Sequence, residues 1–385
     1  MTNMPSSAAK IVFVTRLSES KISSGLAYSA AAQQVQKKIL EELIVQYGSD
    51  NVECISVRPA QAWPKGIFYF SEVKIGPILY THAMNLPIFR GLFSFFVLFT
   101  LLLKNTRKIQ IFYNAYLSDV FVVLLQKLLG IDTKSCIIIQ DIRLDGQNFT
   151  FRARIHDYLA MRFAKYFDLC VPISQQIVND FGLDKERCII FKGGITDIGE
   201  NLLPSLNSLE RIAVFAGALE PYNGSLNLVN QWIQQGIEFP LHIFGKGSEE
   251  IAIRSLAGIS ECVFFHGFEP ENEIIKWQKV ALVNVCLRFG IGLNQKYFFP
   301  SKFFNIACAP GYVLVNNFFG IPEQVVNYLV VVDDNLSSLK SCLNELIEDY
   351  ESTNGVRNDI RRKLIVEQFT WKSCVNAIAS HLCKE

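Results

Sequence analysis

The sequence predicts an α/β protein built from two doubly wound parallel-sheet domains in tandem. Short, β-branched apolar runs alternate with longer helical stretches along nearly the whole chain. These runs are continuously hydrophobic, which is typical of parallel strands covered by helices on both faces. The alternation lapses once, over residues 192–209, which are rich in Gly, Asn and Ser. A chain of 385 residues has room for two domains of about 150–200 residues each.

In chain order, the first half has predicted strands at residues 11–14, 52–57, 109–113, 136–139, 169–173 and 188–191. Helices are expected between them, including 25–47, 118–129 and 151–167. The second half has predicted strands at residues 212–215, 241–244, 263–265, 281–286, 312–315 and 329–332, and one amphipathic helix over 367–382. We therefore expect domains at 1–205 and 206–366. Because open parallel sheets bind ligands at the carboxyl ends of their strands, two facing sheets predict a small-molecule cleft between them.

The composition excludes several classes of protein. Half of the chain is hydrophobic and only 19% is charged, which excludes a disordered protein. Lys and Arg number 37 and Asp and Glu 36, so the net charge of +1 predicts no nucleic-acid partner. The ten cysteines form no CxxC pair and most lie in apolar runs, as free cysteines do in a reducing cytosol. The start of the chain lacks the apolar core of a secretory leader, so we expect a cytoplasmic protein.

The most apolar segment, residues 86–103, favours one of two interpretations. Its charge-free part, residues 91–103, is 13 residues long, whereas a membrane-spanning helix needs about 20. A helix buried against a sheet is the first interpretation. The second is a helix in the surface of the inner membrane, with a peripheral contact from Leu86 to Lys108 that uses the basic exit of Lys104, Arg107 and Lys108.

The loop after the first predicted strand has features of a ligand site. Gly25 opens the first long helix, and Ser24 is a candidate N-cap. Free backbone N–H groups at such a helix start can bind an anion or a sugar hydroxyl, although an ordinary capped turn explains the pattern equally well. The chain contains neither GxGxxG nor GxxxxGK[ST], which removes the usual dinucleotide and P-loop fingerprints.

The second half carries an ordered series of motifs. They are FAGALEPYNG at 215–224, LHIFGKG at 241–247, FHGFE at 265–269, PSKFFN at 300–305 and GIPE at 320–323. This order resembles the GT-B glycosyltransferases, in particular the retaining family 4 (group 1) enzymes. The resemblance covers the second half closely and the first half only by its layout. It implies two Rossmann-like domains facing across a cleft, and a terminal segment, 367–385, that returns to the first domain.

The resemblance also implies roles for individual residues. A nucleotide-sugar donor would lie mainly in the second domain and an acceptor in the first, with Lys302 and Asp141 as catalytic residues. A departing diphosphate gains negative charge, which suits Lys302, and Lys246 is the second candidate cation. Solvated surface lysines and a turn carboxylate are the alternatives for these positions. The implied donor residues are Gly25, Gly217, Asn223, Lys246, Phe268, Ser301, Asn305 and Glu323, and the implied acceptor residues are Ser24, Gln140 and Arg143.

Several positions depart from the family pattern. Ala218 and Asn223 stand where cationic or polar family residues are usual, and Tyr297 and Asn305 stand where a pair of glutamates is usual. These departures favour a second interpretation, in which the chain is a catalytically silent partner that keeps the fold and binds a sugar nucleotide or another transferase.

The leading expectation is a hexosyltransferase-type glycosyltransferase that retains the anomeric configuration and acts in bacterial surface polysaccharide biosynthesis. Its acceptor would be a lipid-linked or growing polysaccharide. The five histidines show no metal-ligand spacing, so the sequence predicts no bound metal and no cofactor, the nucleotide sugar being a substrate.

Overall fold

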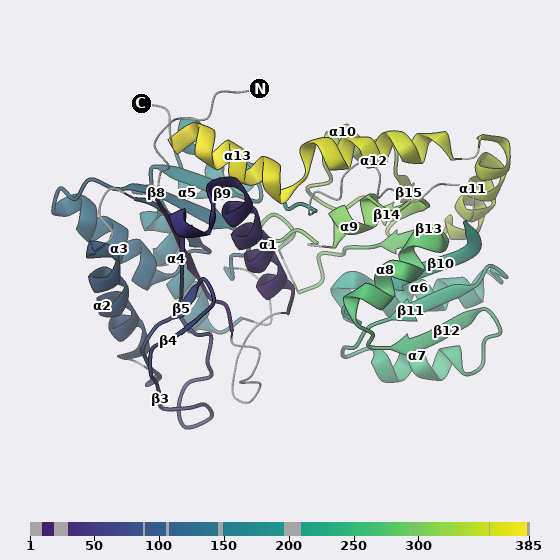
Figure 1. Cartoon of the computed structure of the whole chain (residues 1–385). Coiled ribbons are helices and arrows are strands. Elements are labelled where there is room, and N and C mark those ends of the chain that lie inside the picture. Colours follow the sequence, from purple (N-terminus) through teal and green to yellow (C-terminus); the bar gives the residue numbers. More distant parts are fainter. Residues whose placement is uncertain are drawn as a thin grey trace. The chain divides into compact units, whose positions relative to one another are not determined.

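The computed structural model describes residues 10–18, 30–87, 89–104, 108–144, 149–195, 209–292, 294–300, 302–353 and 355–382. The chain forms two compact units (Figure 1). Unit 1 comprises Met1–Lys192 and Trp371–Glu385, and unit 2 comprises Gly193–Thr370. The division at 192/193 lies upstream of the position 205/206 expected from the sequence. The chain thus leaves unit 1 once and returns to it at its end.

Unit 1 is built on a seven-stranded sheet with the order β4-β5-β2-β1-β7-β8-β9. Its strands are β1 (Ile11–Thr15), β2 (Val52–Ser56), β4 (Val73–Ile75), β5 (Ile78–Tyr80), β7 (Ile109–Tyr113), β8 (Lys134–Ile139) and β9 (Leu169–Pro172). All neighbours are parallel except β4, which is antiparallel to β5. In the central register, Phe13 of β1 lies opposite Cys54 of β2 and Ile111 of β7. A separate antiparallel pair joins β3 (Tyr69–Phe70) to β6 (Ala83–Met84).

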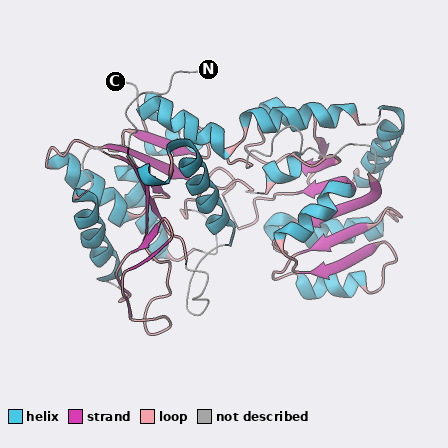
Figure 2. Cartoon of the chain, viewed as in Figure 1, coloured by secondary structure: helices cyan, strands magenta, loops and turns pink. Residues whose placement is uncertain are grey.

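Helices cover both faces of this sheet (Figure 2). They are α1 (Ala30–Tyr47), α2 (Phe89–Leu103), α3 (Leu117–Leu128), α4 (Phe151–Ala164), α5 (Gln175–Phe181) and α13 (Trp371–Leu382), with short 3-10 turns η1 (Ser49–Asn51) and η2 (Lys185–Arg187). Leu43 of α1 and Trp371 of α13 share one core with Phe13. Because right-handed crossovers run from β1 to β2 in one direction and from β7 to β8 in the other, α3 and α4 lie on the face opposite α1.

Helix α2 is exposed along much of its apolar surface. Only Ser94, Leu98 and Leu102 are buried, which form one stripe at i, i+4 and i+8. Phe89, Leu92 and Phe96 are 55%, 54% and 55% exposed. The predicted helix buried against a sheet is therefore covered only in part, because α2 packs against α3 and β6 along one stripe. Of the predicted basic exit, Lys104 is exposed and Lys108 pairs with Glu53 at 3.1 Å, while Arg107 lies outside the described residues.

Unit 2 is built on a six-stranded, fully parallel sheet with the order β12-β11-β10-β13-β14-β15. Its strands are β10 (Glu210–Ala216), β11 (Leu241–Phe244), β12 (Val263–Gly267), β13 (Ala281–Cys286), β14 (Tyr312–Asn316) and β15 (Val330–Val332). Its helices are α6 (Ser225–Gln234), α7 (Glu250–Ala257), α8 (Glu271–Val280), α9 (Phe303–Ala307), α10 (Glu323–Val326), α11 (Leu339–Thr353) and α12 (Val356–Gln368), preceded at α6 by the 3-10 turn η4 (Pro221–Asn223).

Alternate residues of these strands enter separate cores. Phe215 packs with Trp232 of α6 and Leu343 of α11, whereas Val214 packs with Ile274 of α8. Burial on both faces explains why the strands are hydrophobic at nearly every position.

Two predicted elements differ from the structure, and the start of a third cannot be compared with it. Residues 188–191 form no strand, because Cys188 makes only a single bridge to Cys170. The terminal helix predicted over 367–382 is two helices, α12 and α13, which are separated at Phe369 and Thr370. Phe369 leaves the helical path because its ring stacks on Phe304 and its carbonyl accepts from the N–H of Ile195 at 2.8 Å. Residues 25–29, the predicted start of the first helix, lie outside the described residues.

A fully buried arginine links α9, α12 and the start of β14. Arg361 is 0% exposed. Its guanidinium donates to the carbonyl oxygens of Ala307, Ala309 and Gly311 at 2.8, 2.6 and 2.7 Å, and to Asn358 Oδ1 at 2.8 Å. The side chain therefore supplies hydrogen bonds to three carbonyls at the end of α9 and in the turn before β14.

Candidate functional site

The strand order of unit 2 defines where a ligand site is expected. From β10 the chain proceeds to β11 and β12 on one side and then returns to β13, β14 and β15 on the other. The connections that follow β10 and β13 therefore diverge at the carboxyl ends of two adjacent strands. This topological switch point is the usual binding crevice of an open α/β sheet.

The loop after β10 is held in place by backbone contacts. Gly217 donates its N–H to the carbonyl of Phe244 at 3.0 Å, which ties the loop to the end of β11. The side chain of Asn223 donates to the carbonyl of Ala218 at 2.8 Å. Gly224 has φ 65°, and a Cβ there would lie 2.1 Å from the ring of Phe289. Glycine is therefore required where α6 begins, because this backbone lies against the loop that follows β13.

Arg288, directly after β13, reaches across the switch point. Its Nη1 donates to Asn223 Oδ1 at 2.9 Å, and its guanidinium carbon lies 4.8 Å from the centre of the Tyr222 ring. The backbone of Arg288 exchanges two hydrogen bonds of 2.8 Å with the amide of Asn316, at the end of β14. Phe289 N–H also donates to the carbonyl of Tyr222 at 2.8 Å. A cation therefore stands at the switch point, beside the asparagine that departs from the family pattern.

Arg288 is the site residue that the sequence interpretation missed. Its position two residues after a predicted strand, 281–286, is the only sequence signal for it. Asn223 and Arg288 are 65 positions apart, so nothing local in the sequence indicates that they touch.

The glycine loop after β11 brings three predicted residues together. Gly245 has φ 144°, and a Cβ there would lie 1.8 Å from the carbonyl oxygen of Gly217. Lys246 follows it, and its Nζ lies 4.8 Å above the ring of Phe268. Lys246 and Phe268 are both exposed, so this cation–π contact is formed at the surface. The motifs LHIFGKG and FHGFE therefore meet at the same strand ends.

Gly245→Ala is expected to lower the free energy of unfolding by about 1–3 kcal/mol, because an L-residue is strained at this φ and its Cβ overlaps the carbonyl of Gly217. Urea unfolding of the variant measures the change. Gly258→Ala is the matched control, since Gly258 has φ −69° and its Cβ would make only ordinary contacts at 3.5 Å. Equal stability of the two variants would contradict the close approach of these loops.

The remaining predicted donor residues lie on α9 and α10. Lys302 precedes α9 and is exposed; desolvation lowers the pKa of its ammonium group, whereas Glu271 and Cys286 act in the opposite direction. Its proximity to Cys286 places it near the end of β13. Asn305 is half-buried within α9, and Glu323 is the exposed first residue of α10. Among described residues, no hydrogen bond joins these three side chains to the loop after β10.

The switch point of unit 1 lies between β1 and β7 and contains a buried ion pair. Arg16 follows β1, and its Nη2 contacts the two carboxylate oxygens of Asp119 at 2.7 and 2.9 Å. The guanidinium also lies 4.1 Å from the centre of the Tyr116 ring, just before α3. Gln36 of α1 accepts from the Arg16 backbone N–H at 2.6 Å. The first βα turn and the start of α3 are therefore joined at the strand ends.

The predicted acceptor residues follow β8, next to this ion pair. The backbone N–H of Gln140 donates to Asn114 Oδ1 at 2.9 Å, and Asn114 adopts φ 62°. Arg143 makes a bidentate contact with Asp157, Nε to Oδ2 at 2.9 Å and Nη2 to Oδ1 at 2.7 Å. The hydrogen bond to Asp157 raises the pKa of Arg143, and the exposed Asp141 nearby adds to this effect.

No protein-family model matches the chain, and no curated protein matches it either. Solved structures, in contrast, match it over nearly its full length. An α,α-trehalose-phosphate synthase (UDP-forming) from Burkholderia vietnamiensis has a TM-score of 0.66 at 8% identity, over 98% of this chain and 99% of that chain. Anabaena Alr3699/HepE in complex with UDP has a TM-score of 0.66 at 14% identity, over 98% and 100%. The lipopolysaccharide outer core galactosyltransferase WaaB has a TM-score of 0.65 at 16% identity, over 97% and 100%.

The chain has the GT-B fold. The two doubly wound α/β domains predicted from the sequence are confirmed, one in each unit. Identities of 8–16% establish the GT-B fold alone, so the assignment of site residues depends on the geometry of this chain. Three of the predicted residues, Ser24, Gly25 and Ser301, lie outside the described residues of the GT-B chain.

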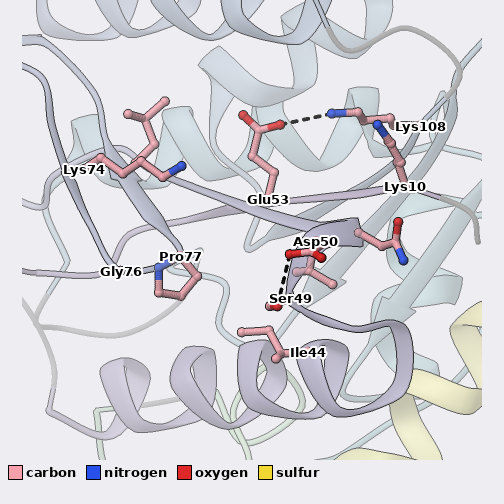
Figure 3. A pocket seen from close by; sticks show the side chains of 12 residues that line it. Lys10, Ile44, Ser49, Asp50, Glu53, Lys74, Gly76, Pro77 and Lys108 are labelled. Carbon is pink, nitrogen blue, oxygen red and sulfur yellow. Dashed lines mark hydrogen bonds and ion pairs between the residues drawn. The ribbon is translucent and has the colours of Figure 1, made fainter.

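A cavity of about 590 Å³ lies at the other end of the unit 1 sheet (Figure 3). It is lined by residues next to the amino ends of β1, β2 and β7, among them Lys10, Glu53 and Lys108. The ion pair between Lys108 and Glu53, drawn as a dashed line in Figure 3, lies on its wall. This cavity is therefore separate from the carboxyl-end residues of the GT-B sheets.

Among the described residues, no group of three or more His, Cys, Asp or Glu side chains is placed to hold a metal ion. None of the described helices has both the length and the apolar character needed to cross a bilayer.

Proposed function

We propose that the protein transfers a sugar from a nucleoside-diphosphate sugar to an acceptor hydroxyl, with the donor in unit 2 and the acceptor in unit 1. The observation that carries this proposal is the switch point of unit 2, where Arg288, Asn223 and the Gly217 and Gly245 loops converge. Oriented N–H groups and cations at such strand ends suit a diphosphate. The UDP-forming synthase and the UDP complex among the similar structures support a nucleotide donor.

In this proposal, cations stabilise the departing diphosphate. Arg288 takes over the charge that the family pattern places near Asn223, and Lys302 and Lys246 approach from α9 and the Gly245 loop. The bond between C1 of the sugar and the diphosphate oxygen breaks, the acceptor oxygen bonds to C1, and the hydroxyl proton leaves with the diphosphate. Preorganised positive charge lowers the barrier for this step without a metal.

Retention of configuration and membership of family 4 remain parts of the proposal. They are supported by the order of the motifs in unit 2. Tyr297 is 8% exposed and Asn305 is half-buried, so neither supplies the carboxylate that the family has at these positions. Asn305 can hydrogen-bond a ribose hydroxyl, and Glu323, Phe268 and Gly217 complete the proposed donor site. Asp141 and Gln140 are the proposed sugar-facing residues of unit 1.

The experiment that tests the proposal incubates the purified chain with UDP- and GDP-sugars and follows nucleotide release with and without a polyprenyl-linked acceptor. We expect release from one donor, accelerated by the acceptor. Binding of a nucleotide without release across the whole panel would favour the silent-partner interpretation, which the replacement of both glutamates motivates. Absence of any nucleotide binding would contradict both.

We further propose that the acceptor is lipid-linked, in the synthesis of a bacterial surface polysaccharide, and that unit 1 contacts the inner membrane through α2. The exposed apolar residues Phe89, Leu92 and Phe96 support this contact, and the exposed Lys104 follows the other end of α2. A helix of this kind lies in the headgroup region and is attracted to anionic lipid.

Replacing Phe89, Leu92 and Phe96 together by serine is expected to lower binding to phosphatidylglycerol-containing vesicles by about 100-fold or more, because each apolar side chain contributes about 1.5–3 kcal/mol on burial. Vesicle flotation measures the bound fraction. The control replaces Ile251 and Ile259 of unit 2, which are each 82% exposed, by serine. Equal flotation of both variants, or none by the unsubstituted chain, would exclude α2 as a membrane contact.

A further inference from the structure

Four arginines lie near one another at the carboxyl edge of the unit 1 sheet, and one of them, Arg16, lies 4.1 Å from the centre of the Tyr116 ring. Arg16 follows β1, Arg143 follows β8, Arg90 is the second residue of α2 and Arg152 is the second residue of α4. Desolvation lowers the pKa of Arg90, and the neighbouring Arg152, Arg16 and Arg143 lower it further. The charges of all four side chains therefore act on one small region.

Two of these arginines already have carboxylate partners. Arg16 is paired with Asp119 and Arg143 with Asp157, each in a bidentate contact. Both carboxylates are buried, at 0% and 5% exposed, so each is committed to its partner. These ion pairs hold Arg16 and Arg143 in place. Because the carboxylates neutralise both guanidinium groups, the two arginines attract an anionic ligand only weakly.

The other two arginines, Arg90 and Arg152, have no carboxylate partner among the residues that the structure describes. Arg90 Nη1 donates to the carbonyl of Ala60 at 2.8 Å, and Arg152 Nη2 donates to the carbonyl of Pro87 at 2.6 Å. In the described part of the chain, neither has an ion pair within 4.0 Å. Both side chains are exposed, so each keeps donors that a ligand can reach.

The helices add to this positive potential. α2, α3 and α4 begin at Phe89, Leu117 and Phe151, next to these arginines. The contact of Arg152 with the carbonyl of Pro87 brings the starts of α4 and α2 together. The N–H of Leu117 points to His156 Nε2 at 3.5 Å, which places the start of α3 against α4. Each helix start presents about half a positive charge, so the region favours an anion.

We propose that Arg90 and Arg152 bind a phosphate group of the acceptor, so that the acceptor is a phosphate monoester or a diphosphate rather than a neutral sugar. This inference rests on the proposed function, and it specifies the substrate class of unit 1. Guanidinium groups match phosphate oxygens through paired N–H donors. A soluble sugar phosphate and a polyprenyl phosphate both carry this phosphate group. They differ only in the part of the molecule attached to the phosphate.

The test measures binding of inorganic pyrophosphate to the full chain by calorimetry, with saturating UDP present to occupy unit 2. We expect Arg90→Gln and Arg152→Gln each to weaken pyrophosphate binding by about tenfold, as the loss of a charge-assisted hydrogen bond does. Arg162→Gln, on the last turn of α4, is the matched control and is expected to change affinity less than about twofold, because Arg162 is exposed and lies away from the helix start.

Further outcomes separate this inference from the proposed function. Undiminished binding by the Arg90→Gln and Arg152→Gln double variant, or no binding by the unsubstituted chain that still binds UDP, overturns the inference and leaves the proposed function intact. If UDP does not bind, the proposed function fails, while pyrophosphate alone still tests the arginines. Binding to phosphatidylcholine vesicles that carry a polyprenyl phosphate, compared with binding of glucose 6-phosphate, distinguishes a lipid phosphate from a soluble sugar phosphate.

The folding control is the thermal unfolding midpoint. A midpoint equal to that of the unsubstituted chain shows that Arg152→Gln folds.

Discussion

Arg288→Ala is expected to lower kcat/KM for the nucleotide-sugar donor by about 10- to 100-fold. The side chain supplies charge-assisted hydrogen bonds at the switch point of unit 2, and one such bond contributes about 1.5–3 kcal/mol. The loss should appear in the affinity for UDP and not in that for uridine, because the proposed function assigns the guanidinium to the phosphate oxygens. Nucleotide-release kinetics and calorimetry with the two ligands measure the effect.

A second substitution distinguishes the loss of the positive charge of Arg288 from the loss of its structural contacts. Asn223→Lys in the Arg288→Ala background returns a cation to the position where the family pattern has one, and we expect it to recover at least part of the UDP affinity. Arg254→Ala, at an exposed position of α7, is the control for loss of a positive charge in unit 2. If Asn223→Lys restores nothing and the thermal midpoint has fallen, Arg288 acts by holding the loop and the proposed ligand role is wrong.

Arg361→Met is expected to lower the free energy of unfolding of unit 2 by about 3–5 kcal/mol. The substitution removes the donors for the carbonyls of Ala307, Ala309 and Gly311, and a buried carbonyl without a partner costs about 1–3 kcal/mol. Urea unfolding followed by tryptophan fluorescence measures the change, since Trp232 lies in the unit 2 core.

The control for this experiment is Lys363→Met, two positions along the same helix α12. Lys363 is exposed, so its replacement should change stability by less than about 0.5 kcal/mol. A similar effect of both substitutions would mean that the loss arises from α12 itself and not from the three carbonyls.

Much of the fold follows from the sequence because parallel strands are buried on both faces. Runs such as 109–113 and 281–286 are apolar at nearly every position and match β7 and β13 closely. The hairpin of β4 and β5 could not be recognised in this way. Val73 and Ile75 of β4 are exposed, and this edge strand gains its place only through pairing with β5.

The candidate site was predictable only where its residues lie in one loop. The glycines of LHIFGKG and FAGALEPYNG are visible because close backbone approach excludes a side chain at Gly245. The contact between Arg288 and Asn223 depends instead on β13 returning to the side of β10, which the order of elements along the chain does not specify. The proximity of Arg90 and Arg152 could not be predicted either, because it depends on how the starts of α2, α3 and α4 pack together.

The core of unit 1 is complete only after α13 has been synthesised. α13 contributes Trp371, Cys374, Val375, Ile378 and Leu382 to the core of unit 1. On the ribosome, the whole of unit 2 emerges before these residues do, so the nascent first unit exposes the matching faces of α1 and the sheet until α13 has been synthesised. A premature stop codon directly before Trp371 would therefore yield a chain whose second unit is complete and whose first unit is a target for chaperones and proteases.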